Sequence, residues 1–398
     1  MSTSTVPNSA RILKQKFTQS MGLPFKELLP ESQIEQTITE LSIKYKNRLF
    51  TPIVTLWTFL SQVLDVDKSC HNAVSRVISW LSSEGVEIPS TDTSAYCQAR
   101  KRLPEKLLEK LFLQSGETLE SKTKNEHLWC DRHVQVIDCS TVSMPDTEQN
   151  QQAYPQSGKQ KKGCGFPIAK LAVIFSLATG AAMNLAIDVL NTNDIKLARR
   201  LYQFLKPKEV LLGDSAVCSY ADFFWLLSRG CDVVVRKHSA RCQKLKGGVL
   251  VGKNDKIITW NKPKARPRGV TKEEFDALPK TLKIREICYS IEIAGFRTKS
   301  VSLLTTLLDT QTYSTTSLIQ LYQKRWDVEL DLKHLKTSLG MDILRSKTPQ
   351  MIRKEIYVFI LAYNLIRSLM WDAASTHNTP PLRLSLQATR NHMSNFIP

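Results

Sequence analysis

Acidic residues, paired cysteines and long apolar runs are all scarce in this sequence of 398 residues. Asp and Glu number 37 against 55 Lys and Arg, so the chain carries a formal charge of +18 at pH 7, which favours a polyanionic partner such as nucleic acid. The nine cysteines form no C-x-x-C pair and no regular spacing, which argues against a disulfide framework and suits a reducing cytoplasm. The first ten residues show no charged segment followed by an apolar one, so no secretory signal is expected.

Two further absences concern membranes and zinc. The most apolar stretch, residues 171–190, is interrupted by polar residues and by Gly180, so we interpret it as two paired core strands rather than a membrane span. Cys231, His238 and Cys242 are of the residue types that bind zinc, but a fourth ligand is not apparent, and a zinc site is the weaker interpretation.

The basic excess is concentrated in one segment. Residues 235–300 hold 17 basic and 6 acidic side chains, a net charge of +11, whereas residues 1–128 hold 16 and 14, a net charge of +2. A solvated surface does not usually gather its charge in this way, so we expect residues 235–300 to contact phosphates. With 42% apolar residues, a chain of this length is expected to fold into two or three globular domains.

The first 125 residues are predicted to be helical. Thr51-Pro52 is an N-cap followed by a first-turn proline, and it opens an apolar helix. Further helices are expected to begin near residues 69, 94 and 104. A basic turn fits a helix-turn-helix-like module that contacts DNA, while the nearly neutral charge of this region fits a structural bundle equally well; the turn consists of Arg100, Lys101 and Arg102.

Beyond residue 132 apolar strands alternate with helices, which is the order of a mixed α/β fold. A polar loop over 145–165 carries Lys159, Lys161 and Lys162. Residues 235–300 contain alternating segments such as KIITW and are interpreted as an inserted, mostly β unit. The predicted strands are 133–138, 167–178, 182–190, 209–214, 231–236 and 301–309, and the predicted helices are 193–204, 219–229, 317–339 and 351–373.

Two of these strands end in an aspartate, Asp138 and Asp214. Ligand and metal sites in open α/β sheets gather at strand ends, so the two carboxylates are candidate metal ligands. An aspartate in such a place is more often a turn or cap residue. Phosphodiester chemistry uses divalent cations held by carboxylates to activate the attacking oxygen and to neutralise charge around phosphorus, and it would need a third carboxylate here.

The predicted helix over 317–339 supplies that third carboxylate. Four of its residues follow the spacing Y-x2-R-x3-E-x6-K and lie within about 60° of one another at 100° per residue: Tyr322, Arg325, Glu329 and Lys336. Lys333 lies on the same face. One carboxylate among cations is the arrangement of a metal ligand surrounded by phosphate-binding side chains, and it also fits a solvated helix with i,i+4 ion pairs.

This spacing, together with VIDCSTVSMPDT around Asp138 and LLGDSAVCSYADF around Asp214, resembles the DDE transposases of bacterial insertion sequences. In that family the Y-x2-R-x3-E-x6-K motif defines the group, and the resemblance covers most of the chain. It implies an α/β, ribonuclease-H-like catalytic core with a β-rich insertion, preceded by an all-helical N-terminal domain. The implied division is a helical DNA-binding domain over 1–128, a catalytic core over 129–234 and 301–345, the basic insertion over 235–300, and a C-terminal helical region over 346–398, which relatives commonly continue further.

The resemblance also implies an activity, which is metal-dependent cleavage of double-stranded DNA at terminal inverted repeats followed by strand transfer into target DNA. Asp138, Asp214 and Glu329 would hold two Mg²⁺ ions, or Mn²⁺ in their place. Tyr322, Arg325 and Lys336 would hold DNA phosphates near the transposon end. The other expected DNA contacts are Lys333, Lys159, Lys161, Lys162, Arg100, Lys101 and Arg102. The enzyme would act as a homodimer on paired ends, in the bacterial cytoplasm at the nucleoid, with no membrane partner.

Two positions bear on this resemblance. The residue after the first aspartate is usually glycine in the family, and here it is Cys139. Some relatives stack a flipped base on a tryptophan of the insertion; Trp260 is a candidate, although a core tryptophan is the commoner role. Two alternative functions stay open, namely an inactive or repurposed DNA-binding relative and a metal-dependent nuclease without strand transfer. Inverted terminal repeats beside the gene would favour transposition.

Overall fold

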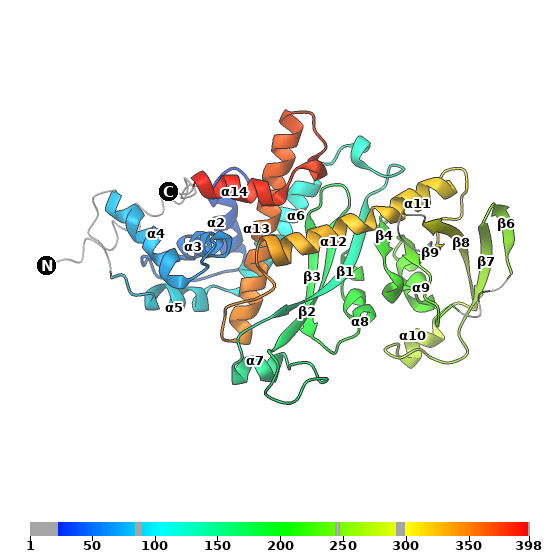
Figure 1. Cartoon of the computed structure of the whole chain (residues 1–398), viewed down its shortest axis with the longest axis horizontal. Coiled ribbons are helices and arrows are strands. Elements are labelled where there is room, and N and C mark those ends of the chain that lie inside the picture. The colour runs from blue at the N-terminus through cyan, green and yellow to red at the C-terminus, as the bar shows by residue number, and fades with distance from the viewer. Residues whose placement is uncertain (1–22, 84–89, 243–244, 246, 292–298, 397–398) are drawn as a thin grey trace. The chain divides into compact units, whose positions relative to one another are not determined.

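The computed structural model describes residues 23–83, 90–242, 245, 247–291 and 299–396 (Figure 1). The chain divides into two compact units. The helical unit comprises Met1–Lys122, Val142–Ile168 and Lys333–Pro398, and the sheet unit comprises Thr123–Thr141 and Ala169–Leu332.

Helices build the helical unit. The hydroxyl of Thr51 accepts a hydrogen bond from the backbone N–H of Val54, and Pro52 occupies the first turn of α3, so the predicted cap is confirmed. The described helices of this unit are α2 (Glu31–Glu40), α3 (Pro52–Leu64), α4 (Cys70–Ser83), α5 (Ser94–Arg102), α6 (Glu105–Glu120), α7 (Glu148–Ala153), a π-helix (His334–Ser338), α13 (Pro349–Thr376), a 3₁₀ turn (Pro381–Arg383) and α14 (Leu386–Phe396).

The long helix α13 lies at the centre of the helical unit and packs against α3, α6 and α14. Among the described helices, it alone is long and apolar enough to cross a membrane, and 83% of its most apolar 18-residue window is buried inside the protein. Its buried Lys354 donates through Nζ to the carbonyl oxygens of Arg100 and Lys101, at 3.3 and 2.8 Å, and so satisfies the C-terminal end of α5. The helix is therefore packed as a core element.

A nine-stranded sheet forms the second unit, in the order β3-β2-β1-β4-β5-β9-β8-β7-β6. Strands β1, β4 and β5 pair in parallel, whereas β2 pairs antiparallel with β3, as predicted for residues 171–190, and the strands from β5 to β6 also pair antiparallel. The strands are β1 (Val134–Ser143), β2 (Ile168–Ser176), β3 (Ala182–Val189), β4 (Val210–Gly213), β5 (Asp232–Arg236), β6 (Val249–Gly252), β7 (Asp255–Asn261), β8 (Thr281–Ile291) and β9 (Lys299–Thr305).

Two helices cover one face of this sheet, and their apolar side chains form a core with alternate strand residues. Helices α8 (Asp194–Arg199) and α9 (Tyr220–Ser228) contribute Leu197 and Phe223, and the strands contribute Ile137, Leu211 and Val233. Alternation follows from strand geometry, because successive side chains point to opposite faces. Each such side chain contributes roughly 2 kcal/mol when fully buried. The remaining helices are α10 (Lys272–Asp276), α11 (Thr315–Gln323) and α12 (Arg325–Lys333), with 3₁₀ turns at Asn125–His127, Tyr202–Phe204 and Ser215–Val217.

The basic insertion continues the sheet. Its strands β6, β7 and β8 are joined to the core through β9, which pairs with β8 on one side and with β5 on the other. Among the described residues the insertion therefore extends the sheet and does not form a separate layer. Its predicted, mostly β structure is confirmed.

The single uninterrupted helix predicted over 317–339 is wrong. The structure divides this segment into α11, α12 and the π-helix His334–Ser338. At Lys324 the helix narrows locally toward a 3₁₀ turn, because the N–H of Lys324 is shared between the carbonyl oxygens of Gln320 and Leu321. Gly340, with a φ of 72°, follows the last turn as expected. A π-turn holds more residues than an α-turn, so Lys336 is displaced from the face that a continuous α-helix would give it.

Candidate active site

Asp138 and Asp214 lie on adjacent parallel strands in matching register. β1 pairs with β4 so that Val134 is opposite Val210 and Val136 is opposite Leu212. The same register, continued by two residues, sets Asp138 opposite Asp214. Strand β1 runs on to Ser143, so the strand end predicted at Asp138 is wrong; the residue lies just past the part of β1 that pairs with β4. The prediction ended the strand at residue 138 because the residues that follow in β1 are mostly polar.

The two aspartates line one small cavity of about 20 Å³ together with Cys139 and Asp194. Oδ1 of Asp138 accepts from the backbone N–H of Cys139 at 2.8 Å, and Oδ1 of Asp214 accepts from the N–H of Ala216 at 2.7 Å. Asp214 therefore caps the following 3₁₀ turn, which is the commoner role of such an aspartate. In each carboxylate the second oxygen makes no hydrogen bond to any described residue, so capping leaves that oxygen available as a metal ligand.

Glu329 is held by an arginine. Its side chain on α12 is 54% exposed, and Oε1 accepts from Nη2 of Arg325 at 2.7 Å. The Arg325 guanidinium lies over the ring of Tyr322, 5.8 Å from its centroid, and both side chains are nearly buried. Within the described residues no three His, Cys, Asp or Glu side chains are close enough together to hold a metal ion. The structure thus brings Asp138 and Asp214 together and pairs Glu329 with Arg325.

Asp138, Asp214, Glu329 and Arg325 nevertheless interact electrostatically. Burial raises the pKa of Asp138 to about 6; the Cys139 N–H and the charge of Arg325 oppose that rise, whereas the charges of Asp214 and Glu329 add to it. The three carboxylates and Arg325 therefore act on one another. A divalent cation among them would favour the ionised form of the carboxylates.

Cys139, the departure from the family pattern, behaves as a small apolar residue. Burial raises the pKa of its thiol to about 12, with Asp194 and Asp138 adding to the rise. The thiol is therefore protonated at neutral pH and is a poor metal ligand in that form. It packs against the core beneath the sheet helices.

The predicted DNA contacts of the helical unit fall into two classes. Arg100 packs its guanidinium over Phe59 and Tyr96, 4.8 and 5.1 Å from the ring centroids, and donates to Gln62 at 3.0 Å, so it is part of the helix packing. The others have side chains that are wholly or partly exposed. Three of these lysines lie in a turn whose backbone is hydrogen-bonded to the side chain of Gln156. These exposed residues are Lys101, Arg102, Lys159, Lys161, Lys162, Lys333 and, in part, Lys336.

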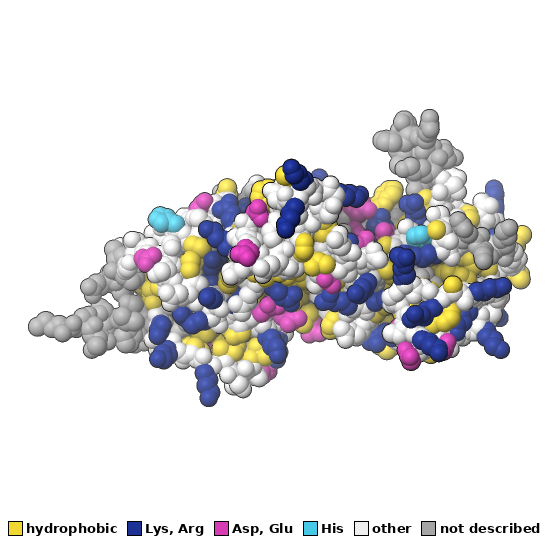
Figure 2. All heavy atoms as spheres, turned by 90° about the horizontal axis from the view of Figure 1, so that it is seen from below, with side chains coloured by type: hydrophobic (Ala, Val, Ile, Leu, Met, Phe, Trp, Pro, Cys, Tyr) yellow, Lys and Arg dark blue, Asp and Glu magenta, His cyan; other side chains and the backbone are white. Residues whose placement is uncertain are grey.

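Part of the basic charge of the insertion is neutralised internally. The fully buried Arg285 donates through Nε to Oδ1 of Asp255 at 2.8 Å. Lys237 and Lys256 both pair with the buried Glu286, at 2.6 and 3.0 Å. Figure 2 shows the remaining Lys and Arg side chains spread over the part of this face that holds β6, β7, β8 and α10, rather than gathered in one ridge.

Trp260 has the core role that its residue type most often takes. It is 6% exposed and meets Tyr220 and Phe223 edge-on, with ring centroids 5.4 Å apart in both pairs. Its faces are therefore covered by protein, and a base-stacking role receives no support.

Two exposed apolar residues beside Glu329 were not predicted from the sequence. Trp326 is 47% exposed and Leu330 is 52% exposed on α12. An apolar i,i+4 pair inside a charged helix is the pattern that could have revealed them. Exposed aromatic rings stack on unpaired bases in proteins that bind single-stranded nucleic acid.

Comparison with known proteins gives matches to a family model, to sequence relatives and to a solved structure. The family model described as transposase DDE domain matches residues 129–365. The transposase of insertion sequence element IS4 from Escherichia coli (strain K12) is 24% identical over 324 residues, covering 79% of this chain and 69% of that protein. A putative transposase of insertion sequence element IS186A from the same organism is 37% identical over 81 residues, 20% of each chain. A solved structure of the piggyBac transposase synaptic complex with hairpin DNA is similar over 94% of this chain and 80% of that chain, with 12% identity and a TM-score of 0.48.

Proposed function

This chain belongs to the DDE transposase family, and we propose that Asp138, Asp214 and Glu329 are its catalytic carboxylates. The protein is a DNA transposase, an enzyme that cleaves DNA and transfers the cut strand. The observation that carries the residue assignment is the register of β1 and β4, which sets Asp138 opposite Asp214 at one cavity. Glu329 is assigned by its motif spacing and by its electrostatic effect on Asp138.

We propose further that β3, β2, β1, β4 and β5, with α8 and α9 on one face, form a ribonuclease-H-like core. Support comes from the mixed sheet, in which three parallel strands adjoin an antiparallel pair, and from the position of β6 to β8 between Asp214 and Glu329. The helices α2 to α6 would form the N-terminal DNA-binding domain, and the domain limits at residues 128, 234, 300 and 345 belong to the same proposal.

As a DDE transposase the enzyme depends on a divalent metal. We assign that role to Mg²⁺, as two ions, with Mn²⁺ able to substitute. The oxygen ligands fit a hard cation, because Asp138 and Asp214 each offer an oxygen that their backbone hydrogen bonds leave open. Glu329 would join them by leaving Arg325. Bound metal supplies Lewis acidity, which activates the attacking oxygen and stabilises the leaving oxygen.

Arg325 has two tasks in this proposal. Its guanidinium orients Glu329 in the absence of DNA. When DNA binds, the guanidinium donates two hydrogen bonds to a phosphate, and the ring of Tyr322 keeps it in place. We propose that the exposed cations Lys333, Lys336, Lys101 and Arg102 and the lysines of the turn over 159–162 contact the DNA backbone. Arg100 is excluded because its guanidinium is committed to packing.

The protein binds DNA. We propose that the bound duplexes are the terminal inverted repeats and the target, that the synapsed form is a homodimer, and that it works in the cytoplasm at the nucleoid. The assay below separates transposition from the two alternatives that the sequence left open, an inactive DNA-binding relative and a nuclease without strand transfer.

A cleavage assay on a labelled terminal-repeat duplex, with Mg²⁺ or with a chelator, tests the proposal. Asp138→Asn and Glu329→Gln should lower nicking at the repeat boundary by about a thousandfold or more while retaining DNA binding. Asp188→Asn, the same chemical change on β3, is the matched control and should cleave normally. Normal cleavage by Glu329→Gln would remove that residue from the site. Binding without cutting by the wild type would favour the inactive relative, and cutting without joining would favour the nuclease.

A further inference from the structure

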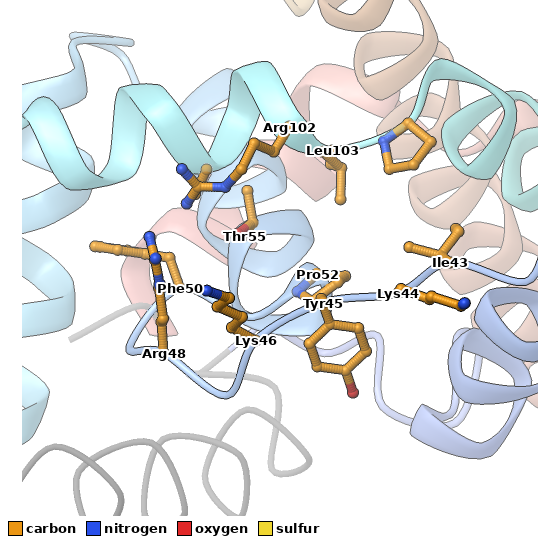
Figure 3. Close-up of a pocket in the computed structure, with 12 residues that line it drawn as sticks. Ile43, Lys44, Tyr45, Lys46, Arg48, Phe50, Pro52, Thr55, Arg102 and Leu103 are labelled. Carbon is orange, nitrogen blue, oxygen red and sulfur yellow. The ribbon is translucent and has the colours of Figure 1, made fainter.

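The helical unit contains a cavity of about 450 Å³ that the proposed catalytic site does not use (Figure 3). The extended segment over residues 43–48 forms one wall, and the end of α5 with the start of α3 forms the other. We call this cavity the basic pocket. Its volume lies within the range of about 300 to 1,000 Å³ that is typical of small-ligand sites.

The inner surface of the basic pocket is apolar. Phe50, Ala99 and Leu103 line it and are 9%, 4% and 3% exposed, so they form a fixed floor that belongs to the core of the helical unit. Tyr45, which is 46% exposed, adds an aromatic ring at the rim. A floor of this kind favours a flat apolar group over a hydrated ion.

All of the ionisable groups at the rim, apart from the tyrosine, are cationic. Lys44, Lys46, Arg48 and Arg102 line the basic pocket, and none of them forms an ion pair with a carboxylate of the described residues. Figure 3 shows the charged ends of Lys46, Arg48 and Arg102 toward the same end of the pocket, with Lys44 toward the other. Unneutralised cations gathered at one end of an apolar cavity fit a ligand that carries its negative charge at one end.

We propose that the basic pocket binds a single unstacked nucleotide of the bound DNA, with its base between the Phe50 and Leu103 floor and the Tyr45 ring at the rim, and its phosphate between Arg48 and Arg102. The inference deepens, and rests on, the DNA binding of the proposed function. A free phosphate would gain nothing from the apolar floor, and a neutral apolar molecule would gain nothing from the four cations. A nucleotide uses both, because aromatic stacking and guanidinium–phosphate contacts are the usual means of holding unpaired strands.

Fluorescence anisotropy with the full chain, in a chelator so that no cleavage occurs, tests this proposal. Three labelled duplexes of the same sequence are compared: one fully paired, one with a single bulged nucleotide, and one with an abasic residue at the bulge. The bulged duplex should bind about tenfold more tightly than the paired one, since stacking of one base has an effect of that order. The abasic bulge is as flexible but lacks the base, so it should lose this advantage.

Variants locate the effect. Tyr45→Ala and Arg48→Ala should each remove most of the preference for the bulged duplex. Lys106→Ala, which removes an exposed charge on neighbouring α6 without lining the basic pocket, is the matched control and should keep the preference. A 5-iodouridine at the bulge should crosslink to the peptide that contains Tyr45.

Equal affinity for paired and bulged duplexes would overturn the proposal, as would a preference that survives in the abasic duplex or a crosslink outside residues 43–55 and 99–104. Preferential binding of an acidic peptide that the bulged duplex does not displace would also overturn it. Failure of the catalytic assignment is distinguishable, because it would appear as normal cleavage by Asp138→Asn and would leave all of these binding measurements unchanged.

Discussion

The basic insertion and the basic pocket arrange their cations in opposite ways. The insertion over 235–300 carries a net charge of +11, yet its Arg285 is fully buried against Asp255, and Lys237 and Lys256 share the buried Glu286. The pocket lies in a region whose net charge is only +2 over residues 1–128, yet its four cations have no carboxylate partner among the described residues. Net charge therefore measures the attraction of a segment for polyanions, whereas the pairing of individual cations decides which of them can bind.

The largest effect should come from breaking the buried pair of the insertion. Asp255→Asn leaves the Arg285 guanidinium buried without a counter-charge, and this should lower the free energy of unfolding by about 3–5 kcal/mol. Urea titration followed by tryptophan fluorescence measures the loss. Asp276→Asn on exposed α10 is the control and should leave the unfolding midpoint unchanged. If both variants unfold alike, the buried pair does not stabilise the insertion.

The same pair gives a pH dependence with a definite sign. Burial acts to raise the pKa of Asp255, but hydrogen bonds from Arg285 and Thr315, with the charge of Arg285, outweigh it and lower that pKa. A folded-state pKa below the unfolded value of about 3.9 means that the stabilisation is complete above that value and is lost as the pH falls through the folded pKa. The stability difference between wild type and Asp255→Asn should accordingly hold from neutral pH down to about pH 4 and shrink below it.

Strands of this protein are easier to predict from the sequence than interruptions of its helices, for a physical reason. The buried strands β2 to β5 are short apolar runs bounded by polar residues, so their existence and order could be predicted. The structure pairs β1 with β4 in parallel and sets Asp138 opposite Asp214, whereas the catalytic role of the two aspartates stays a prediction. The division of the helix at Lys324 and the π-turn after Lys333 were not predictable, because no proline or glycine marks them.

The basic pocket was not predictable for a related reason. Lys44, Lys46 and Arg48 stand at every second position of one short segment, and Arg102 is distant from them in sequence. Only tertiary structure brings the two segments to one cavity. In the sequence Arg100 to Arg102 form one basic turn, and nothing in their residue types separates Arg100, which packs on Phe59, from Arg102, which lines the pocket.

A middle-sized effect should come from the pocket itself. The double substitution of Arg48→Ala and Arg102→Ala should weaken binding of terminal-repeat DNA by about tenfold. It should also reduce the slope of log affinity against log salt by roughly one for each arginine that binds a phosphate in the wild type. Both side chains are exposed, so the urea midpoint should stay at the wild-type value. An unchanged salt slope would mean that these arginines do not meet phosphate, and the contrast with the insertion would fail.

The smallest effect should come from single exposed lysines of the insertion, because their contribution is spread over many charges. Lys264 and Lys283 are exposed and form no ion pair among the described residues, and neither lines the basic pocket. Lys264→Ala should therefore lower DNA affinity by about threefold or less, equally for repeat and unrelated sequences, and leave stability unchanged, as measured by anisotropy at two salt concentrations. Combining it with Lys283→Ala should add the two losses, since the two lysines share no ion-pair partner among the described residues. A loss from Lys264→Ala as large as that from the pocket variant, or one confined to repeat DNA, would instead indicate a discrete site on the insertion and would place specific recognition where the net charge is highest.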